Sequence, residues 1–288
     1  MGKLCVLATA ALATRRHAIV VRVAEARGSA PREADTRMLV FADESAGTIG
    51  GGHLELKAID EARAMLRSGD FSPRTRHYPL GPALGQCCGG TVTLNFGKLD
   101  AEALAVWPDT PPRFFLQLYG AGHVGRAIAR ALSPLNVSVD WIDEREEEFP
   151  AQFHDALDAP WPGHIRKVCV DAVEAEVRNA PAGAFYLVLT HRHDLDLRIT
   201  EAILARADFG FLGLIGSKTK RQRFIHRFEQ RGIDPAVISR MTCPIGVAGI
   251  QGKEPEVIAA AVAAQLLQAS SETAARRSAD LATAASTA

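Results

Sequence analysis

Two adjacent cysteines, Cys87 and Cys88, are the residues of this 288-residue chain best suited to chemistry. They lie in the run Gly85-Gln86-Cys87-Cys88-Gly89-Gly90, so glycines stand on both sides of them. Glycine permits a close approach between backbone and ligand, and a thiolate is a soft metal ligand and a nucleophile. The run therefore indicates a site where one sulfur meets a bound group. A tight turn that buries two small apolar side chains explains the same residues.

The spacing of the cysteines argues against two familiar uses of thiols. A structural zinc site needs cysteines about two to four residues apart and repeated elsewhere, whereas Cys5, Cys169 and Cys243 stand singly. A thioredoxin-type relay needs two residues between its thiols, and a disulfide between neighbours is strained. The pattern thus favours one sulfur presented to a ligand while the other packs or assists.

A second glycine-rich run lies upstream of the cysteines. Gly50, Gly51 and Gly52 lead into a helix that apolar spacing predicts over 54–67. Backbone amides in such a run can form a nest for an anion beside the cysteine segment. A flexible turn is the alternative explanation for three consecutive glycines.

A dinucleotide fingerprint begins in the second half of the chain. An apolar run over 114–119 precedes Gly120, Gly122 and Gly125, and apolar residues at helical spacing follow. Strand, glycine turn and helix in this order predict a Rossmann fold. A second strand ends at Asp143, whose carboxylate is placed to accept hydrogen bonds from a ribose. The alternative is that the glycines serve only the packing of helix on strand.

Further alternating elements extend this pattern into a mostly parallel sheet. Strands are predicted over 184–190 and 209–215, and helices over 195–206 and 218–230. Right-handed crossovers bring the carboxyl ends of such strands to one edge, where ligands of these sheets bind. The predicted fold class is α/β, with a small N-terminal mixed α/β domain followed by a Rossmann-like parallel-sheet domain.

Two polar clusters fall at this edge. Ser217 and Lys218 open a predicted helix, where a hydroxyl, a cation and free amides suit a phosphate, although a solvated basic turn is the alternative. His191, His193 and Asp194 follow a strand and suit a weak metal site or a substrate contact. Alternatively, Asp194 serves as a helix N-cap.

The local composition and the positions of the prolines predict the domain boundaries. The predicted parts are a cysteine-containing domain over 1–105, a Pro-rich linker over 106–112, a Rossmann-like domain over 113–270 and a flexible tail over 271–288. A closing helix is predicted over 254–268 inside the third part.

The charge balance and the hydropathy of the chain limit the kinds of partner that we expect. The chain carries 33 basic and 33 acidic residues, so no electrostatic footprint for nucleic acid or an anionic membrane is expected. No apolar run approaches the roughly 18 residues of a membrane span. The apolar N-terminal residues predict a helix and not a signal peptide. An odd number of cysteines, five, suits a reducing compartment, and we expect a cytoplasmic protein.

These segments together resemble the XdhC/CoxI-type accessory proteins that mature molybdenum hydroxylases such as xanthine dehydrogenase. The resemblance spans most of the chain, and the cysteine run followed by a Rossmann domain is its most specific element. The other carriers are the runs 28–32, 47–55, 120–125, 190–194 and 214–218.

The resemblance implies an accessory protein and not an ordinary enzyme. Similar proteins bind the molybdenum cofactor (molybdopterin), protect it while a cysteine desulfurase supplies its sulfido ligand, and insert it into the apo hydroxylase. Implied partners are therefore apo xanthine dehydrogenase, a cysteine desulfurase and a molybdenum insertase. Cys87, the first cysteine of the pair, is the expected molybdenum contact. The candidate cofactor-binding residues are Cys87, Cys88, Gly85, Gln86, Gly89, Gly90, Gly50, Gly51, Gly52, Gly120, Gly122, Gly125, Asp143, Ser217 and Lys218.

Two other functions stay open. An NAD(P)-dependent oxidoreductase would use the Rossmann domain, with His191 or His193 as acid or base. A thiol or metal sensor would use the cysteines without needing the Rossmann crevice. Vicinal thiols favour the accessory protein over the oxidoreductase, because hydride transfer does not need them. A homodimer is expected, since two-fold dimers are the commonest oligomers.

Overall fold

The computed structural model describes residues 3–80, 90–107, 111–153, 162 and 164–287, with side chains up to residue 275. The chain divides into two compact units, Met1–Pro111 and Pro112–Ala288. Each unit has its own sheet and its own hydrophobic core.

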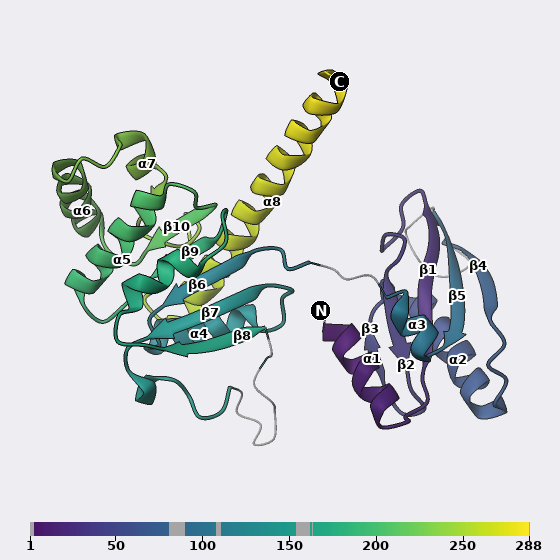
Figure 1. Cartoon of the computed structure of the whole chain (residues 1–288). Helices are drawn as coiled ribbons and strands as arrows, with labels where there is room; N and C mark the ends of the chain where they lie inside the picture. The colour runs from purple at the N-terminus through teal and green to yellow at the C-terminus, as the bar shows by residue number, and fades with distance from the viewer. Residues whose placement is uncertain (1–2, 81–89, 108–110, 154–161, 163, 288) are drawn as a thin grey trace. The chain divides into compact units, whose positions relative to one another are not determined.

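Unit 1 is built on a five-stranded antiparallel sheet in the order β3-β2-β1-β5-β4 (Figure 1). Its strands are β1 (Ile19–Arg27), β2 (Arg37–Val40), β3 (Ser45–Gly47), β4 (Arg74–Pro79) and β5 (Thr91–Lys98). Its helices are α1 (Lys3–Ala13), α2 (Gly52–Ser68) and α3 (Ala101–Ala105).

Alternating apolar residues let both faces of this sheet be covered. On β1, Ile19 and Val21 belong to the core that includes α2, whereas Val20 packs with α1 on the other face. The period of two along a strand sends neighbouring side chains to opposite faces, so one short strand contributes to two cores.

Unit 2 is a doubly wound Rossmann-like domain with a six-stranded sheet in the order β11-β10-β9-β6-β7-β8. Every strand pair in it is parallel. The strands are β6 (Phe115–Tyr119), β7 (Ser138–Asp143), β8 (Ile165–Cys169), β9 (Phe185–Val188), β10 (Phe211–Leu214) and β11 (Met241–Thr242). The α/β fold class expected from the sequence is confirmed.

Helices cover both faces of this sheet, which explains why the central strands are buried throughout. Two helices, α4 (His123–Leu132) and α8 (Pro255–Thr287), pack together over one face (Figure 1). The other face carries α5 (His193–Arg206), α6 (Lys218–Gln230), α7 (Pro235–Ser239) and the 3-10 helix η3 (Val173–Asn179). A second 3-10 helix, η2 (Glu146–Glu148), follows β7.

The last helix is longer than the sequence predicted. A helix over 254–268 and a tail over 271–288 were expected, but α8 continues to Thr287. Alanine has the highest helix propensity, so an Ala-rich stretch extends a helix even without an apolar stripe. No helix in the described part of the chain combines the length and apolarity needed to cross a membrane.

Candidate functional site

The glycine turn of unit 2 has two glycines that the fold itself requires. Gly120 adopts φ +120°, and a Cβ added there would lie 2.4 Å from the carbonyl oxygen of Leu189. A Cβ on Gly125 would lie 2.0 Å from the carbonyl oxygen of Gly120. The first glycine lets β6 approach β9, and the last lets α4 approach the turn.

Gly122 differs, because the fold gives no steric reason for it. It is the N-cap of α4 with an ordinary φ of −66°, and an added Cβ would meet nothing within 4 Å. Open space above a helix N-terminus is what a close approach by a ligand needs. Of the three predicted glycines, this one has the surroundings expected of a ligand contact.

Asp143 lies beside this turn, but its carboxylate is engaged within the protein. It is 4% exposed and accepts a hydrogen bond from the Ala121 amide at 2.7 Å. Arg145 supplies three more, from its amide, Nε and Nη2, each at 3.0 Å. Burial raises the pKa of this carboxyl, but the bonds from Arg145 and Ala121 outweigh it and lower the pKa. Ribose binding by Asp143 stays a prediction, one that would require these partners to be exchanged.

A second set of contacts ties the turn to η2. Arg126 Nε donates to the carbonyl oxygens of Ala121 at 3.0 Å and Glu148 at 2.9 Å. The carboxylate of Glu148 accepts from Arg126 at 2.6 Å and from Arg145 at 3.1 Å. These ion pairs fix the glycine turn to the end of β7.

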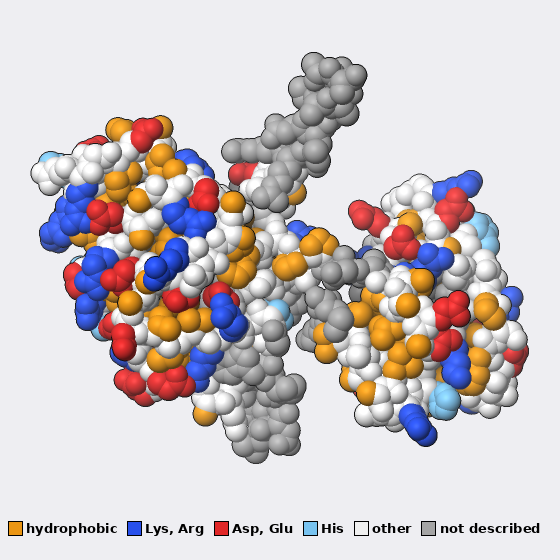
Figure 2. All heavy atoms as spheres, viewed as in Figure 1, with side chains coloured by type: hydrophobic (Ala, Val, Ile, Leu, Met, Phe, Trp, Pro, Cys, Tyr) orange, Lys and Arg blue, Asp and Glu red, His pale blue; other side chains and the backbone are white. Residues whose placement is uncertain are grey.

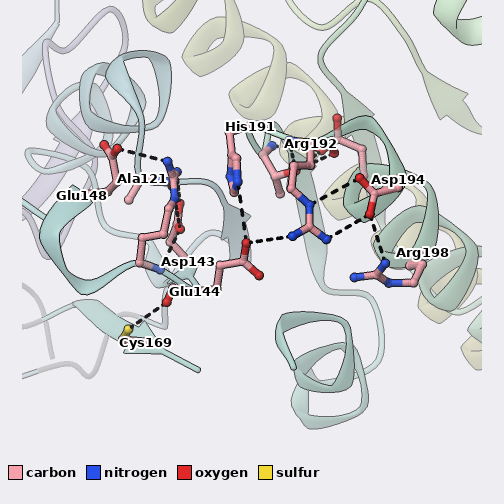
Figure 3. A network of polar contacts seen from close by, with 12 residues as sticks. Ala121, Asp143, Glu144, Glu148, Cys169, His191, Arg192, Asp194 and Arg198 are labelled. Atoms are coloured by element: carbon pink, nitrogen blue, oxygen red, sulfur yellow. Dashed lines mark hydrogen bonds and ion pairs between the residues drawn. The ribbon is translucent and has the colours of Figure 1, made fainter. Parts of the chain in front are cut away.

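Glu144 bridges the ends of two strands, β7 and β9 (Figure 3). Its Oε1 lies 3.7 Å from His191 Nε2 and 3.5 Å from Arg192 Nη1, and its carbonyl oxygen lies 3.8 Å from the thiol of Cys169. Glu144 and His191, together with Thr190 and with Leu195 from α5, line a small hollow at the carboxyl ends of β7 and β9. In the described part of the chain no three His, Cys, Asp or Glu side chains are placed to hold a metal.

The start of α5 corrects one expectation. The N-cap is Arg192, and Asp194 lies one residue inside the helix. Its carboxylate pairs with Arg192 at 3.0 Å and with Arg198 at 3.3 Å, so it is not available to cap the helix amides (Figure 3).

Ser217 and Lys218 have different surroundings at the start of α6. The hydroxyl of Ser217 accepts from the Lys220 amide at 3.2 Å, so this serine is a helix cap. Lys218 is exposed at the first helical position. Lys220, which the sequence analysis did not single out, turns inward and lies 2.6 Å from Asp196. A phosphate contact by Ser217 and Lys218 stays a prediction.

In unit 1, the expected anion nest at 47–52 already holds a carboxylate. Glu55 Oε2 accepts from the amides of Ile49 and Gly51, each at 3.1 Å, and from the Thr48 hydroxyl at 2.5 Å. The Gly50 amide donates to the same hydroxyl at 3.0 Å. The amides of Gly50 and Gly51 are therefore not free as expected, because the Thr48 hydroxyl accepts from Gly50 and a glutamate in the first turn of α2 accepts from Gly51 and from its neighbour Ile49.

The glycine-rich segments of unit 1 nevertheless gather at one place. A Cβ on Gly90 would lie 2.4 Å from the Arg27 carbonyl oxygen, and one on Gly50 would lie 2.5 Å from Pro31. The run 28–31 therefore lies against both glycines. The amide of Leu80 donates to the carbonyl oxygen of Gly90 at 2.7 Å, so the two described residues on either side of 81–89 lie next to each other at this place.

Five of the predicted site residues lie outside the described residues. They are Gly85, Gln86, Cys87, Cys88 and Gly89. Only Gly90, at the end of their run, is placed, and the role of the thiols stays a prediction.

Comparison with known protein families agrees with this arrangement. Residues 116–266, more than half of the chain, match the XdhC Rossmann domain. The chain belongs to the XdhC family. Residues 11–79 match the XdhC and CoxI family, so both units contribute to the assignment.

Two individual proteins resemble this XdhC-family chain. The uncharacterized protein YqeB of Escherichia coli strain K12 is 30% identical over 257 residues, which cover 86% of this chain and 43% of YqeB. The chain thus spans less than half the length of that relative. A crystal structure from Bacillus halodurans, described as a xanthine dehydrogenase, has a TM-score of 0.71 at 19% identity and covers 93% of this chain and 96% of its own. That likeness establishes the fold.

Several residues that shape these sites were not predicted from the sequence. Glu55 carries a usable signal, since an acidic residue in the first turn of a helix often bonds to the amides that precede it. The pair of Asp196 and Lys220 carries none, because its members are 24 residues apart and meet only through the packing of α5 and α6.

Proposed function

We propose that this protein carries the molybdenum cofactor as cargo and delivers it to an apo molybdenum hydroxylase, with xanthine dehydrogenase as the first candidate. Membership of the XdhC family supports a maturation role and fits an accessory factor better than an enzyme. A cysteine desulfurase and a molybdenum insertase are the proposed further partners, and the cytoplasm the proposed compartment. A homodimer is the proposed assembly.

The observation that carries the proposal is the gathering of glycine-rich segments in unit 1. Gly90, which ends the cysteine run, packs on the run 28–31, and Gly50 packs on Pro31 of the same run. Gly51 has φ +75° and open space where its side chain would be. A bulky cargo needs such a place, where backbone is exposed to close approach beside a soft ligand.

The residues have distinct proposed tasks at this place. Cys87 would supply a thiolate to the metal of the cargo, with Cys88 packing or assisting. Gly51 would leave room for the pterin, while Glu55 holds the loop 48–51 in shape and does not itself meet the cargo. One soft ligand and several hydrogen bonds suit firm but reversible binding, which delivery requires.

An anaerobic titration with molybdenum cofactor tests this proposal. Molybdenum and pterin retained after gel filtration would be measured for the wild type, for the variant Cys87→Ala/Cys88→Ala and for Cys169→Ala. Cys169 is an exposed free thiol in unit 2, so its variant controls for nonspecific thiol chemistry. We expect one cofactor per chain in the wild type and in Cys169→Ala, and loss in the double variant. Equal retention by all three proteins would refute the thiol site.

A nucleotide-binding function has one observation in its favour, the open space above Gly122. The engaged carboxylate of Asp143 weighs against it, because a ribose would have to displace Arg145 or Ala121. Fluorescence titration with NADH and NADPH separates the two functions. Tight binding, together with no retention of molybdenum cofactor, would favour the oxidoreductase.

A further inference from the structure

A groove of about 270 Å³ lies between the start of α5 and the exposed side of α6. His193 lines it from α5, and Thr219, Arg223 and Arg227 line it from α6. These three residues of α6 are four positions apart, so they form one stripe along the helix. The groove is therefore walled by a hydroxyl, an imidazole and two guanidinium groups.

The bottom of the groove is closed and electrostatically satisfied. Phe224 is 5% exposed and packs against the aromatic ring of Phe228. Lys220 is bound to Asp196 and to the carbonyl oxygen of Ile215 at 2.9 Å. Neither side chain is free to meet a ligand, so recognition falls to the residues of the rim.

The rim carries positive charge that no acidic side chain among the described residues neutralises. Asp194, the acid lining the groove, is already paired with Arg192 and Arg198. Arg223 and Arg227 are exposed, and within the described part of the chain neither has an acceptor. Helix α6 contains five Lys or Arg residues and one acid, Glu229, and Figure 2 shows blue side chains gathered where Figure 1 places this helix.

We propose that this groove binds a phosphate-bearing small molecule, through Arg223 and Arg227 with Thr219 and His193 as further donors. A guanidinium group bonds two phosphate oxygens at once, and two arginines at i and i+4, whose Cβ atoms are about 5–6 Å apart, match a doubly charged oxyanion better than a single carboxylate. Ser217, for which the sequence predicts a phosphate contact, also lines this groove at the start of α6. This site in unit 2 does not depend on the proposed cysteine site.

Pyrophosphate is a suitable probe, and isothermal titration calorimetry of the full chain measures its binding. The test variant is Arg223→Gln/Arg227→Gln. The matched control is Arg178→Gln/Lys253→Gln, which removes the same charge from two exposed positions of unit 2 away from the groove. We expect one site in the wild type, at least about tenfold weaker binding in the test variant, and a change of less than about twofold in the control.

Three results would overturn the proposal: no binding by the wild type, an equal loss in both variants, or tighter binding of hexaglutamate than of pyrophosphate at the same arginines. The last would make the groove a docking surface for an acidic protein segment. Circular dichroism verifies that each variant is folded, and Arg223→Gln alone, expected to bind at least about threefold more weakly, serves if the double variant does not fold. Retention of molybdenum cofactor is a separate measurement, so either proposal can fail alone.

Discussion

Lys220 Nζ lies 2.6 Å from Asp196 Oδ2, and this ion pair joins α6 to α5 in the interior of unit 2. The two side chains are only 10% and 1% exposed. The other carboxylate oxygen of Asp196 accepts from the amide and the hydroxyl of Thr190, at 2.9 and 2.7 Å. The carboxyl ends of β9 and β10 are thus held together by one buried charge pair, next to the proposed phosphate groove.

Replacing Lys220 with Met should strongly destabilise unit 2. The change leaves the carboxylate of Asp196 buried without its cation, which typically costs about 3–5 kcal/mol. Urea denaturation followed by circular dichroism measures the loss. Lys167→Met, which breaks the exposed pair with Glu146, is the matched control and should cost no more than about 1 kcal/mol. Similar costs for both variants would contradict the buried character of the Lys220 pair.

Gly122 and Gly125, two glycines of the unit 2 turn, should respond differently to alanine. Gly125→Ala places a Cβ 2.0 Å from the Gly120 carbonyl oxygen, so α4 must shift, and we expect a loss of about 3 kcal/mol. Gly122→Ala meets open space and should cost less than about 1 kcal/mol. Thermal unfolding compares the two variants. Equal destabilisation would show that Gly122 also has a structural task.

Asp143 should make unit 2 sensitive to acid. Its pKa in the folded protein is lowered, because the bonds from Arg145 and Ala121 outweigh the effect of burial. The carboxyl therefore stabilises the fold above its unfolded pKa of about 3.9, and this stabilisation is lost as the pH falls through the lower folded pKa. Asp143→Asn should remove this part of the acid dependence, as measured by denaturation at a series of pH values. Arg145→Gln should act in the same direction, and an unchanged acid limb in both variants would contradict the assignment.

The Rossmann half was predictable because its signals are local. The apolar run, the glycine turn and the apolar helix follow one another within about twenty residues, and the apolar residues of the helix recur at helical spacing. Strand β4 had no such signal. It is a polar edge strand whose residues are mostly exposed, and only its pairing with β5 makes it a strand.

The candidate sites were less predictable, because side chains fill places that the backbone pattern leaves open. In the glycine run at 50–52, the amide of Gly51 does donate to an anionic group, but this group is the carboxylate of Glu55, which also accepts from Ile49. Asp143 does end β7 beside the turn, but its carboxylate accepts hydrogen bonds from the Arg145 side chain. Sequence spacing predicts that a residue lies near a site. Its hydrogen-bond partners depend on which charged side chains the tertiary packing brings within bonding distance.

Glu55→Ala should loosen the loop 48–51 and expose the nest that the sequence predicted. The amides of Ile49 and Gly51 would lose their acceptor, which we expect to cost about 1–3 kcal/mol. Hydrogen exchange should then accelerate at these two amides. Lys57→Ala, an exposed position on the same helix, controls for the change to alanine and should leave both amides protected.

Added phosphate should raise the stability of Glu55→Ala more than that of the wild type, because an anion can replace the missing carboxylate in the folded state only. Equal stabilisation of both proteins by phosphate would show that the loop does not form an anion nest.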